Sequence, residues 1–367
     1  MDFDVNAFRG KTILLPCDDP EWSNFTKYFA QNFERFGLKK LISTSYAAAS
    51  KHIQNNYQPT RFESEAKQYD PHKSTTHGKI FTLSHDVTDD NRVDVNDLQW
   101  QYLAGNGDFR SEEVKALRDE ADIVITNPPF SLFREFLAWI VEAKKQFVII
   151  GSKNAITYKE VFPLIKNNKM WVGTTSFNKD MLFVSSEEID PTQKPSTATR
   201  TVDGVVYLRS PSVWFSNIEH GRRHQPLELQ TIEDNLRYNK KMKSKVQYDR
   251  YDNYDAIEVP FTDAIPKNYD GIMGVPISFL DKYCPEQFEI LGATQRGCHD
   301  EVPDIKKYDD YWEVKPNGVK TGSSGGKTNE NANLIGNDGK KNYFTNKEGR
   351  TIQSAYQRIF IKHRKIK

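Results

Sequence analysis

Short apolar runs alternate with amphipathic helical stretches over most of the first 220 residues, and this alternation constrains the fold more than any other feature. KTILLP (11–16) and KKLISTS (39–45) have the length and composition of buried strands. The stretch between them carries apolar rings at helical spacing, namely Phe25, Phe29, Phe33 and Phe36. Gly37 then supplies a helix stop. A strand–helix–strand opening favours a right-handed parallel unit.

The same alternation continues along the chain. Further strands are predicted at KIFTL (79–83), DIVIT (122–126), QFVIIGS (146–152) and KMWVGTT (169–175). SLFREFLAWIVEA (131–143) supplies an amphipathic helix, and VVYLRS (205–210) with SVWFSNI (212–218) predicts a closing hairpin. Residues 1–220 are therefore predicted to form a doubly wound α/β domain.

The character of the chain changes after about residue 220. The stretch around residues 236–259 mixes basic residues with tyrosines, and residues 316–349 are rich in Gly, Asn, Ser and Lys. The latter composition predicts a long flexible loop. AYQRIFIKHRK (355–365) predicts a closing strand. We therefore expect a second domain at 221–367 that contains a flexible loop near 316–349.

Composition restricts the class of protein. The 42.4-kDa chain has a mean hydropathy of −0.71, no apolar run that could span a bilayer and no signal-peptide core. Its cysteines, Cys17, Cys284 and Cys298, have no metal-ligand spacing and form no even disulfide set. We expect a soluble cytoplasmic protein without a metal site. Residues 221–367 carry 25 Lys and Arg against 21 Asp and Glu, which permits a polyanionic partner.

The strand DIVIT runs directly into Asn127-Pro128-Pro129-Phe130. In an open parallel sheet, ligands bind beyond the carboxyl ends of the strands. Each proline fixes φ and removes an N–H, so nearby carbonyl oxygens are held rigidly and need no ladder partner. A planar heterocycle could stack on Phe130 while its amino group donates to the Asn127 side chain and the Pro128 carbonyl. A base in duplex DNA would first have to flip out. The alternative is a plain helix N-terminus with prolines in its first turn.

Six segments go beyond this motif: CDDPEWSNFTKYFAQNFERFGLKKLIS (17–43), GNGDFRS (105–111), ADIVITNPPFSLFREFL (121–137), NAITYKEVFPLIKNNKMWVG (154–173), YDNYDAIEV (251–259) and GIMGVPISFLDKYCPEQFEILG (271–292). With these segments in order, the chain resembles the EcoRI-type adenine-specific DNA methyltransferases of restriction–modification systems. The resemblance runs from about residue 9 to the C-terminus.

The resemblance implies a Rossmann-like S-adenosylmethionine-dependent methyltransferase sheet with a C-terminal target-recognition region. It implies S-adenosylmethionine as methyl donor and adenine N6 in double-stranded DNA as acceptor. Asn127, Pro128, Pro129 and Phe130 would bind the base. Cys17, Asp18 and Asp19 would lie by the methionine part of the cofactor, and Asp108 and Phe109 by its adenine part. A cognate restriction endonuclease is implied by family habit only, and we expect a monomer.

The residues themselves support these cofactor roles unevenly. A carboxylate in a loop after a strand suits an ammonium group or ribose hydroxyls, which fits Asp18 and Asp19. Asp19 fits equally well as the N-cap of the Phe-rich helix. Asp108 could accept from an adenine amino group or could simply form an Asx turn. Thr44, at the end of the second strand, is a weaker candidate.

Two features of the sequence bear on the cofactor pocket. CDDP stands where many methyltransferases have a glycine-rich loop, as in the EcoRI-type pattern. The family also has an Asp-Glu-Phe-Tyr-Thr segment before the first strand, whereas MDFDVNAF precedes RGKTILL here. We expect either that this segment lies upstream of Met1 or that the pocket lacks one wall.

Basic residues of the second domain are candidates for phosphate contact: Arg222, Arg223, Lys240, Lys241 and Lys243. A solvated helix face is the alternative for each. The leading hypothesis is a site-specific DNA adenine-N6 methyltransferase. The competing hypotheses are a methyltransferase of a protein glutamine amide or of RNA, and a catalytically impaired DNA-binding remnant of the family.

Overall fold

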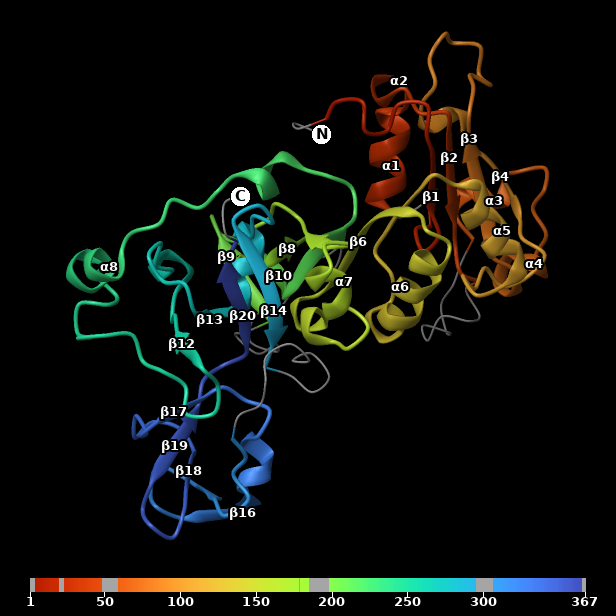
Figure 1. The fold of residues 1–367 in the computed structure, drawn as a ribbon. Helices are drawn as coiled ribbons and strands as arrows, with labels where there is room; N and C mark the ends of the chain where they lie inside the picture. The colour runs from red at the N-terminus through yellow and green to blue at the C-terminus, as the bar shows by residue number, and fades with distance from the viewer. Residues whose placement is uncertain are drawn as a thin grey trace. The chain divides into compact units, whose positions relative to one another are not determined.

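The computed structural model describes residues 4–19, 23–47, 59–177, 179–184, 198–294 and 306–364 (Figure 1). The chain divides into two compact units, one of residues 1–152 with 181–220 and one of residues 153–180 with 221–367. The second unit thus includes residues 153–180, whereas the sequence pattern predicts that they belong to the domain of residues 1–220. Pro20 and Cys298 lie outside the described residues.

The first unit contains six helices and ten strands among its described residues. The helices are α1 (Asn24–Gln31), α2 (Phe33–Phe36), α3 (Arg61–Ser64), α4 (Lys73–Thr76), α5 (Glu112–Glu120) and α6 (Phe133–Glu142). The strands are β1 (Thr12–Leu15), β2 (Lys40–Thr44), β3 (Lys79–Leu83), β4 (Gln99–Tyr102), β5 (Ile123–Thr126), β6 (Gln146–Ser152), β8 (Met181–Phe183), β9 (Thr199–Val202), β10 (Val205–Ser210) and β11 (Ser212–Ser216).

Seven of these strands lie in one mixed sheet in the order β4-β3-β2-β1-β5-β6-β11. β1 pairs in parallel with β2 and β5, and β5 pairs in parallel with β6. β3 is antiparallel to β2 and β4 is antiparallel to β3, so β4 runs in the same direction as β1. The predicted α/β class, with a parallel centre, is confirmed.

The sheet carries its core on both faces. Phe29 of α1 and Phe33 of α2 pack with Ile13 and Ile123 on one face. Successive strand side chains point to opposite faces, so the buried Leu14 lies on the other. The helix predicted across the four phenylalanines is interrupted at Asn32, which caps α1 and whose side chain donates to the Tyr28 carbonyl at 2.8 Å.

The predicted hairpin of residues 205–218 is wrong. β10 pairs with β8 and β9 in a separate three-stranded sheet, whereas β11 pairs antiparallel with β6. Only Pro211 separates β10 from β11, and one residue cannot form a hairpin turn. The actual hairpin joins β9 to β10 through Asp203 and Gly204, both at positive φ. This Asp-Gly pair is itself a strong turn signal in the sequence.

In its described residues, the second unit contains two helices, α7 (Phe162–Lys166) and α8 (Ile232–Tyr238). Its strands are β7 (Trp171–Val172), β12 (Ala256–Glu258), β13 (Ile272–Pro276), β14 (Phe288–Ala293), β15 (Trp312–Val314), β16 (Lys320–Ser324), β17 (Asn333–Ile335), β18 (Tyr343–Thr345), β19 (Thr351–Ser354) and β20 (Arg358–His363). One sheet has the order β12-β13-β20-β14, so the predicted closing strand is confirmed as β20.

Residues 316–349 differ from the long loop that their composition predicts. They supply β16, β17 and β18 to a five-stranded sheet in the order β16-β15-β18-β19-β17. The strands have only three to five residues, and glycines at positive φ occupy the turns. Tyr308, Tyr311, Phe344 and Ile352 form the small core of this sheet. A few apolar residues outside or at the edge of the polar stretch therefore hold it in a sheet.

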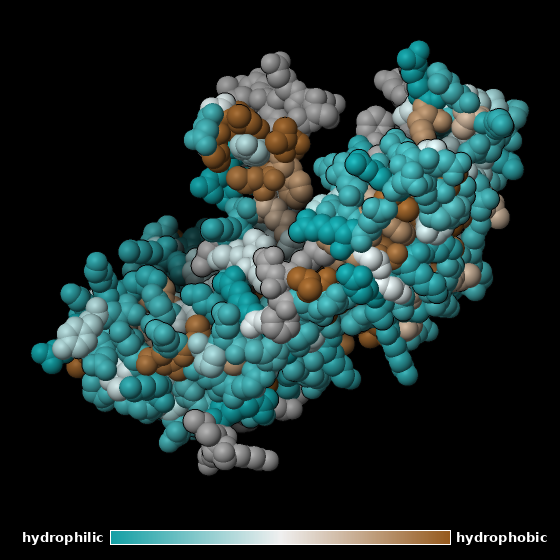
Figure 2. Space-filling view, turned by 90° about the horizontal axis from the view of Figure 1, so that it is seen from above, coloured by the Kyte–Doolittle hydropathy of each residue, from teal (hydrophilic) through white to brown (hydrophobic). Residues whose placement is uncertain are grey.

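The described part of the chain has no helix long and apolar enough to cross a membrane. The face shown in Figure 2 is mostly hydrophilic, with small separate apolar patches. This distribution fits the low mean hydropathy of the sequence.

Candidate active site

The carboxyl ends of β1, β2, β4 and β5 meet at one edge of the first unit's sheet, because these strands run in the same direction. A pocket of about 680 Å³ opens there. It is lined by Pro16, Cys17, Asp19, Tyr46, Gly107, Asp108, Phe109, Arg110, Asn127, Pro128, Pro129, Phe130, Ser131 and Leu132. The predicted base-binding tetrad and four of the six predicted cofactor residues thus share one pocket, which has the usual size of a small-molecule site.

The prolines of the tetrad precede the helix instead of forming its first turn. Pro129 has φ −57° and ψ 124°, a 3₁₀ turn begins at Phe130, and α6 begins at Phe133. The alternative of prolines within the first helical turn is therefore wrong. Asn127 is exposed and Pro128 is buried, so the exposed amide sits on a fixed backbone.

Phe130 presents an open aromatic face to this pocket. Its side chain is 46% exposed, whereas Phe133, three residues later, is buried against Phe215. A half-exposed phenylalanine in a pocket wall is a ready stacking surface for a flat ligand.

Asp108 is already engaged by Arg110. The guanidinium donates to Oδ1 at 2.9 Å and to Oδ2 at 2.7 Å, and the Arg110 backbone N–H also donates to Oδ1. The side-chain hydrogen bond from Arg110 holds the pKa of Asp108 below its usual range. Each carboxylate oxygen has two lone pairs, so Oδ2 can still accept from an amino group.

Phe109 is buried, with edge-to-face contacts to Phe136 and Trp139 of α6 at ring-centroid distances of 5.1 and 5.7 Å. It lines the pocket, and its contacts with α6 anchor the loop that carries Asp108. Of the two residues predicted beside the cofactor's adenine part, Phe109 is therefore held by α6 and Asp108 by Arg110.

Asp18 lies beneath the pocket rather than in its lining. Its Oδ1 accepts from the Ser23 hydroxyl at 2.8 Å, and its Oδ2 accepts from the Thr126 hydroxyl at 2.5 Å. Burial raises the pKa of this carboxyl to about 6, against hydrogen bonds from Thr126, Ser23 and the Asn127 backbone that lower it. The neighbouring Cys17 does line the pocket, and burial, aided by Asp18, raises the pKa of its thiol to about 12.

Asp19 is not the N-cap of the Phe-rich helix. Ser23 caps α1, and its hydroxyl accepts from the backbone N–H groups of Phe25 and Thr26. The Ser23 backbone N–H donates to the Asp19 carbonyl at 2.6 Å. The Asp19 side chain lines the pocket, so the capping alternative is excluded.

Thr44 is fully buried and does not line the pocket. Its hydroxyl donates to the Pro16 carbonyl at 3.0 Å, and the neighbouring Ser43 hydroxyl donates to the Asp18 carbonyl. These two side chains of β2 support the backbone of the loop after β1 from below.

Sequence reasoning missed Tyr46 and the role of two glycines. Tyr46 lines the pocket directly after β2, in the same position relative to its strand as Cys17 relative to β1. Gly107 has φ +81°, and a Cβ there would clash with the Ser45 carbonyl oxygen. Gly78 lies against the same carbonyl and against Gly107. The position of Tyr46 just after a strand could have predicted it as a pocket residue. The close contact between the backbones of Ser45, Gly78 and Gly107 could not be predicted from the sequence.

The two predicted arginines of the second unit differ in environment. Arg223 is 5% exposed, its guanidinium lies 3.7 Å from the Trp171 ring centroid, and it donates to the Asn168 side chain. A buried guanidinium with these contacts is part of the interior, which corrects its expected role in phosphate contact. Arg222 is exposed and donates to the Thr174 carbonyl.

The predicted lysines follow α8 instead of lying on it, because the helix ends at Tyr238. Lys240, Lys241 and Lys243 are exposed. Lys241 pairs with Asp263 at 3.1 Å and lies over the Phe261 ring at 4.6 Å. The alternative of a solvated helix face does not apply to this turn.

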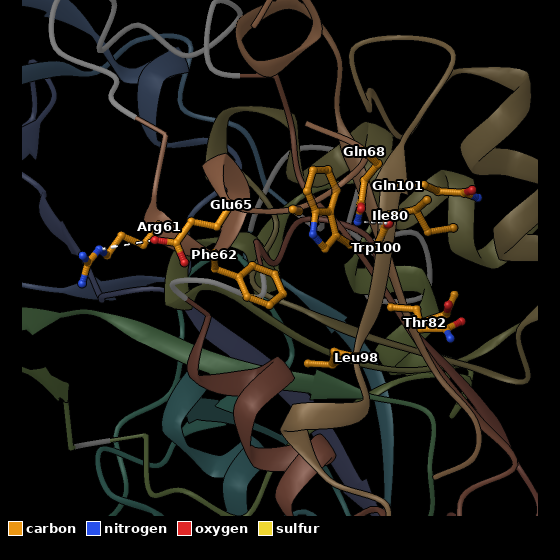
Figure 3. Close-up of a pocket in the computed structure, with 11 residues that line it drawn as sticks. Arg61, Phe62, Glu65, Gln68, Ile80, Thr82, Leu98, Trp100 and Gln101 are labelled. Atoms are coloured by element: carbon orange, nitrogen blue, oxygen red, sulfur yellow. Dashed lines mark hydrogen bonds and ion pairs between the residues drawn. The ribbon is translucent and has the colours of Figure 1, made fainter. Parts of the chain in front are cut away.

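A second pocket of the first unit, about 740 Å³, lies at β3 and β4 (Figure 3). The Phe62 and Trp100 rings and polar side chains such as Gln68 line it. None of the predicted site residues belongs to its lining. The pocket at the strand ends is therefore the candidate active site.

Comparisons with known proteins identify relatives of this chain. The model of the family described as "Adenine-specific methyltransferase EcoRI" matches residues 1–364. The chain is 38% identical over 286 residues to the Type II methyltransferase M.EcoRI of Escherichia coli, covering 77% of this chain and 79% of that protein. It is 33% identical over 287 residues to the Type II methyltransferase M.MpnI of Mycoplasma pneumoniae, covering 78% and 76%. No solved structure matches the chain.

Proposed function

Because the chain belongs to the EcoRI family of adenine-specific methyltransferases, we propose that it transfers a methyl group from S-adenosylmethionine to N6 of an adenine flipped out of duplex DNA. A single observation carries this proposal. The Asn127–Phe130 segment and the acidic and aromatic residues suited to a nucleoside cofactor line the same pocket.

The side chains on the cofactor side of this pocket fit S-adenosylmethionine. The Asp19 carboxylate suits the methionyl ammonium group, and the remaining lone pair of Asp108 suits an adenine amino group. Cys17 and Phe109 supply a neutral and partly apolar wall. Thr44 and Asp18 form hydrogen bonds to protein groups, so we assign both to support of the loop. The bound cofactor supplies an electrophilic methyl group.

The tetrad supplies the grip on the acceptor base. A flipped adenine stacks on the exposed face of Phe130, while its amino group donates to the Asn127 side-chain oxygen and to the Pro128 carbonyl. Both acceptors sit on a backbone that the prolines fix. Two hydrogen bonds donated by the amine direct its remaining lone pair away from the acceptors and toward the methyl donor. Positioning of this kind accounts for a large part of many rate enhancements.

Residues 221–367 would then serve target recognition, and residues 1–220 catalysis. Arg222, Lys240, Lys241 and Lys243 remain our candidates for phosphate contact because their side chains are exposed. We place the reaction in the cytoplasm and expect a monomer that works beside a cognate restriction endonuclease without a stable complex.

The direct test is transfer of labelled methyl groups from S-adenosylmethionine to duplex DNA, followed by nucleoside analysis. We expect N6-methyladenine, and unmodified duplex should outcompete RNA and glutamine-containing peptides as acceptor. Calorimetric titration with S-adenosylmethionine separates an active enzyme from an impaired remnant. DNA affinity without cofactor binding would support the remnant.

A further inference from the structure

Asp18 connects three segments that meet below the candidate active site. It belongs to the loop after β1, its carboxylate accepts from Ser23 at the N-cap of α1, and it accepts from Thr126 at the end of β5. A hydrogen bond from the Asn127 backbone N–H is also among the causes that lower the pKa of this carboxyl group. The buried Asp18 side chain thus joins the loop after β1 to Asn127, whose side-chain oxygen is the proposed acceptor.

The loop that carries Asp18 is itself fixed from β2. Ser43 donates to the Asp18 carbonyl, Thr44 donates to the Pro16 carbonyl, and Thr26 of α1 hydrogen-bonds to Ser43 at 2.9 Å. The carboxylate therefore has a rigid base. A rigid base allows it to set the position of whatever it holds on its other side.

We infer that Asp18 is a positioning residue for Asn127, and that it acts by holding the Thr126–Asn127 backbone rather than by binding the cofactor. This inference rests on the function proposed above for Asn127. It assigns Asp18 a role different from the cofactor contact that the family resemblance implies. Its side chain is 6% exposed and lies outside the pocket lining, which fits a supporting role.

The ionised carboxylate is the form suited to this task. It only accepts hydrogen bonds, and the Asn127 N–H can only donate, so the two match in a single arrangement. Protonation adds an O–H donor, which competes with the donors already present. Because burial raises the pKa of Asp18 to about 6, this loss falls within an accessible pH range.

Burial and Arg110 shift the pKa values of Cys17 and Asp108, two other ionisable groups of the pocket, away from the range around the pKa of Asp18. Cys17 stays neutral because the pKa of its thiol is raised to about 12. Asp108 stays ionised because Arg110 lowers its pKa. Asp19, Tyr46 and Arg110 are the remaining ionisable side chains of the pocket lining. The segments that contact the Asp18 carboxylate from α1 and β5 contribute the hydroxyls of Ser23 and Thr126.

The test compares Asp18→Asn with the wild-type protein. The amide has the same shape, so the fold is retained while the charge and one acceptor are lost. At pH 8 we expect kcat to fall about tenfold or more, as a small misplacement of a reacting group would cause. The dissociation constant for S-adenosylmethionine, measured by calorimetry, should stay within about threefold. The wild-type activity should fall as the pH drops through about 6, and this limb should be absent from the variant.

Asp122→Asn is the matched control. Asp122 lies at the opposite end of the same strands, where its carboxylate accepts from the Thr12 backbone N–H at 2.8 Å. It should behave as the wild type in kcat and in pH profile. A variant Asp18→Asn with weakened cofactor binding and an unchanged kcat at saturating cofactor would instead make Asp18 a cofactor ligand.

Amide hydrogen exchange gives a readout that does not need activity. Asp18→Asn and Asp18→Ala should both speed exchange at Asn127, and Asp122→Asn should not. If the wild-type protein transfers no methyl group but exchange at Asn127 responds, the proposed function fails and the positioning role stands. If the wild-type protein is active and the Asp18 variants change neither kcat nor exchange, the positioning role is wrong.

Discussion

At the scale of single residues, Asn127 combines an exposed side chain with a constrained backbone. Thr126 before it is buried and bonded to Asp18, and Pro128 after it is buried and lacks an N–H. Exposed asparagines normally sample several backbone conformations, whereas this one is held from both sides. The sequence predicted that the prolines constrain the backbone at Asn127. The structure shows that Asp18 constrains it as well.

We expect Asn127→Ala to lower kcat by about 100-fold or more, because the amine loses one of its two oriented acceptors. The dissociation constant for S-adenosylmethionine should stay nearly unchanged. The measurement is single-turnover methyl transfer with calorimetric cofactor binding. Asn96→Ala, an exposed asparagine of the same unit outside the pocket lining, is the control. Retained turnover would contradict the role of Asn127.

Phe130→Ala should weaken binding of a substrate duplex by roughly 1–3 kcal/mol, the usual contribution of one base stacked on an aromatic ring. Phe130→Trp should retain most of the affinity, since it keeps a flat face. Phe183, on β8 and 43% exposed, provides a control aromatic of similar exposure. Fluorescence of 2-aminopurine at the target position measures the stacking. An equal effect of Phe183→Ala would speak against a specific base contact.

At the scale of elements, the structure depends on close backbone contacts that side-chain patterns do not reveal. Strand positions such as β1, β2 and β5 followed from apolar runs, and their parallel pairing followed from the helices between them. The interruption at Asn32 and the Asp203-Gly204 turn depend on local hydrogen bonds and positive φ values. Periodicity reports which face is buried and says little about such local choices.

Gly107→Ala should destabilise the first unit by about 1–3 kcal/mol or more, because alanine is strained at φ +81° and its Cβ would clash with the Ser45 carbonyl. Gly105→Ala, two residues earlier, has open space around its Cβ and no positive φ, so it should change stability little. Differential scanning calorimetry measures both. Equal melting temperatures for the two variants would show that the backbone contact at Gly107 is not restrictive.

At the scale of the whole molecule, the net charge is close to zero, so DNA binding depends on where the positively charged side chains lie. The chain carries 51 Lys and Arg against 50 Asp and Glu. Some basic residues pair internally, as Arg358 does with the buried Glu258, and Arg223 lies in the interior. Exposed cations outside such pairs are the ones that can release counterions from DNA.

Replacing Lys240 and Lys243 one at a time by alanine should weaken binding similarly for every DNA sequence. Each loss of a phosphate contact should reduce the slope of log affinity against log salt by about 0.9. Lys245, which pairs with Asp249, is the control. Fluorescence anisotropy at several salt concentrations gives the slopes. An unchanged slope would remove that lysine from the set of candidates.

The sequence by itself determined the α/β class, the central parallel strands and the location of the Asn127–Phe130 segment at a strand end, because apolar periodicity and proline chemistry act locally. It also indicated the family, since six long segments occur in order. Tertiary structure alone decided that Asp18 lies under the pocket, that Tyr46 lines it, that Arg223 is buried and that residues 316–349 form a sheet. Burial and hydrogen-bond partners depend on residues distant in the chain, and no local pattern encodes them.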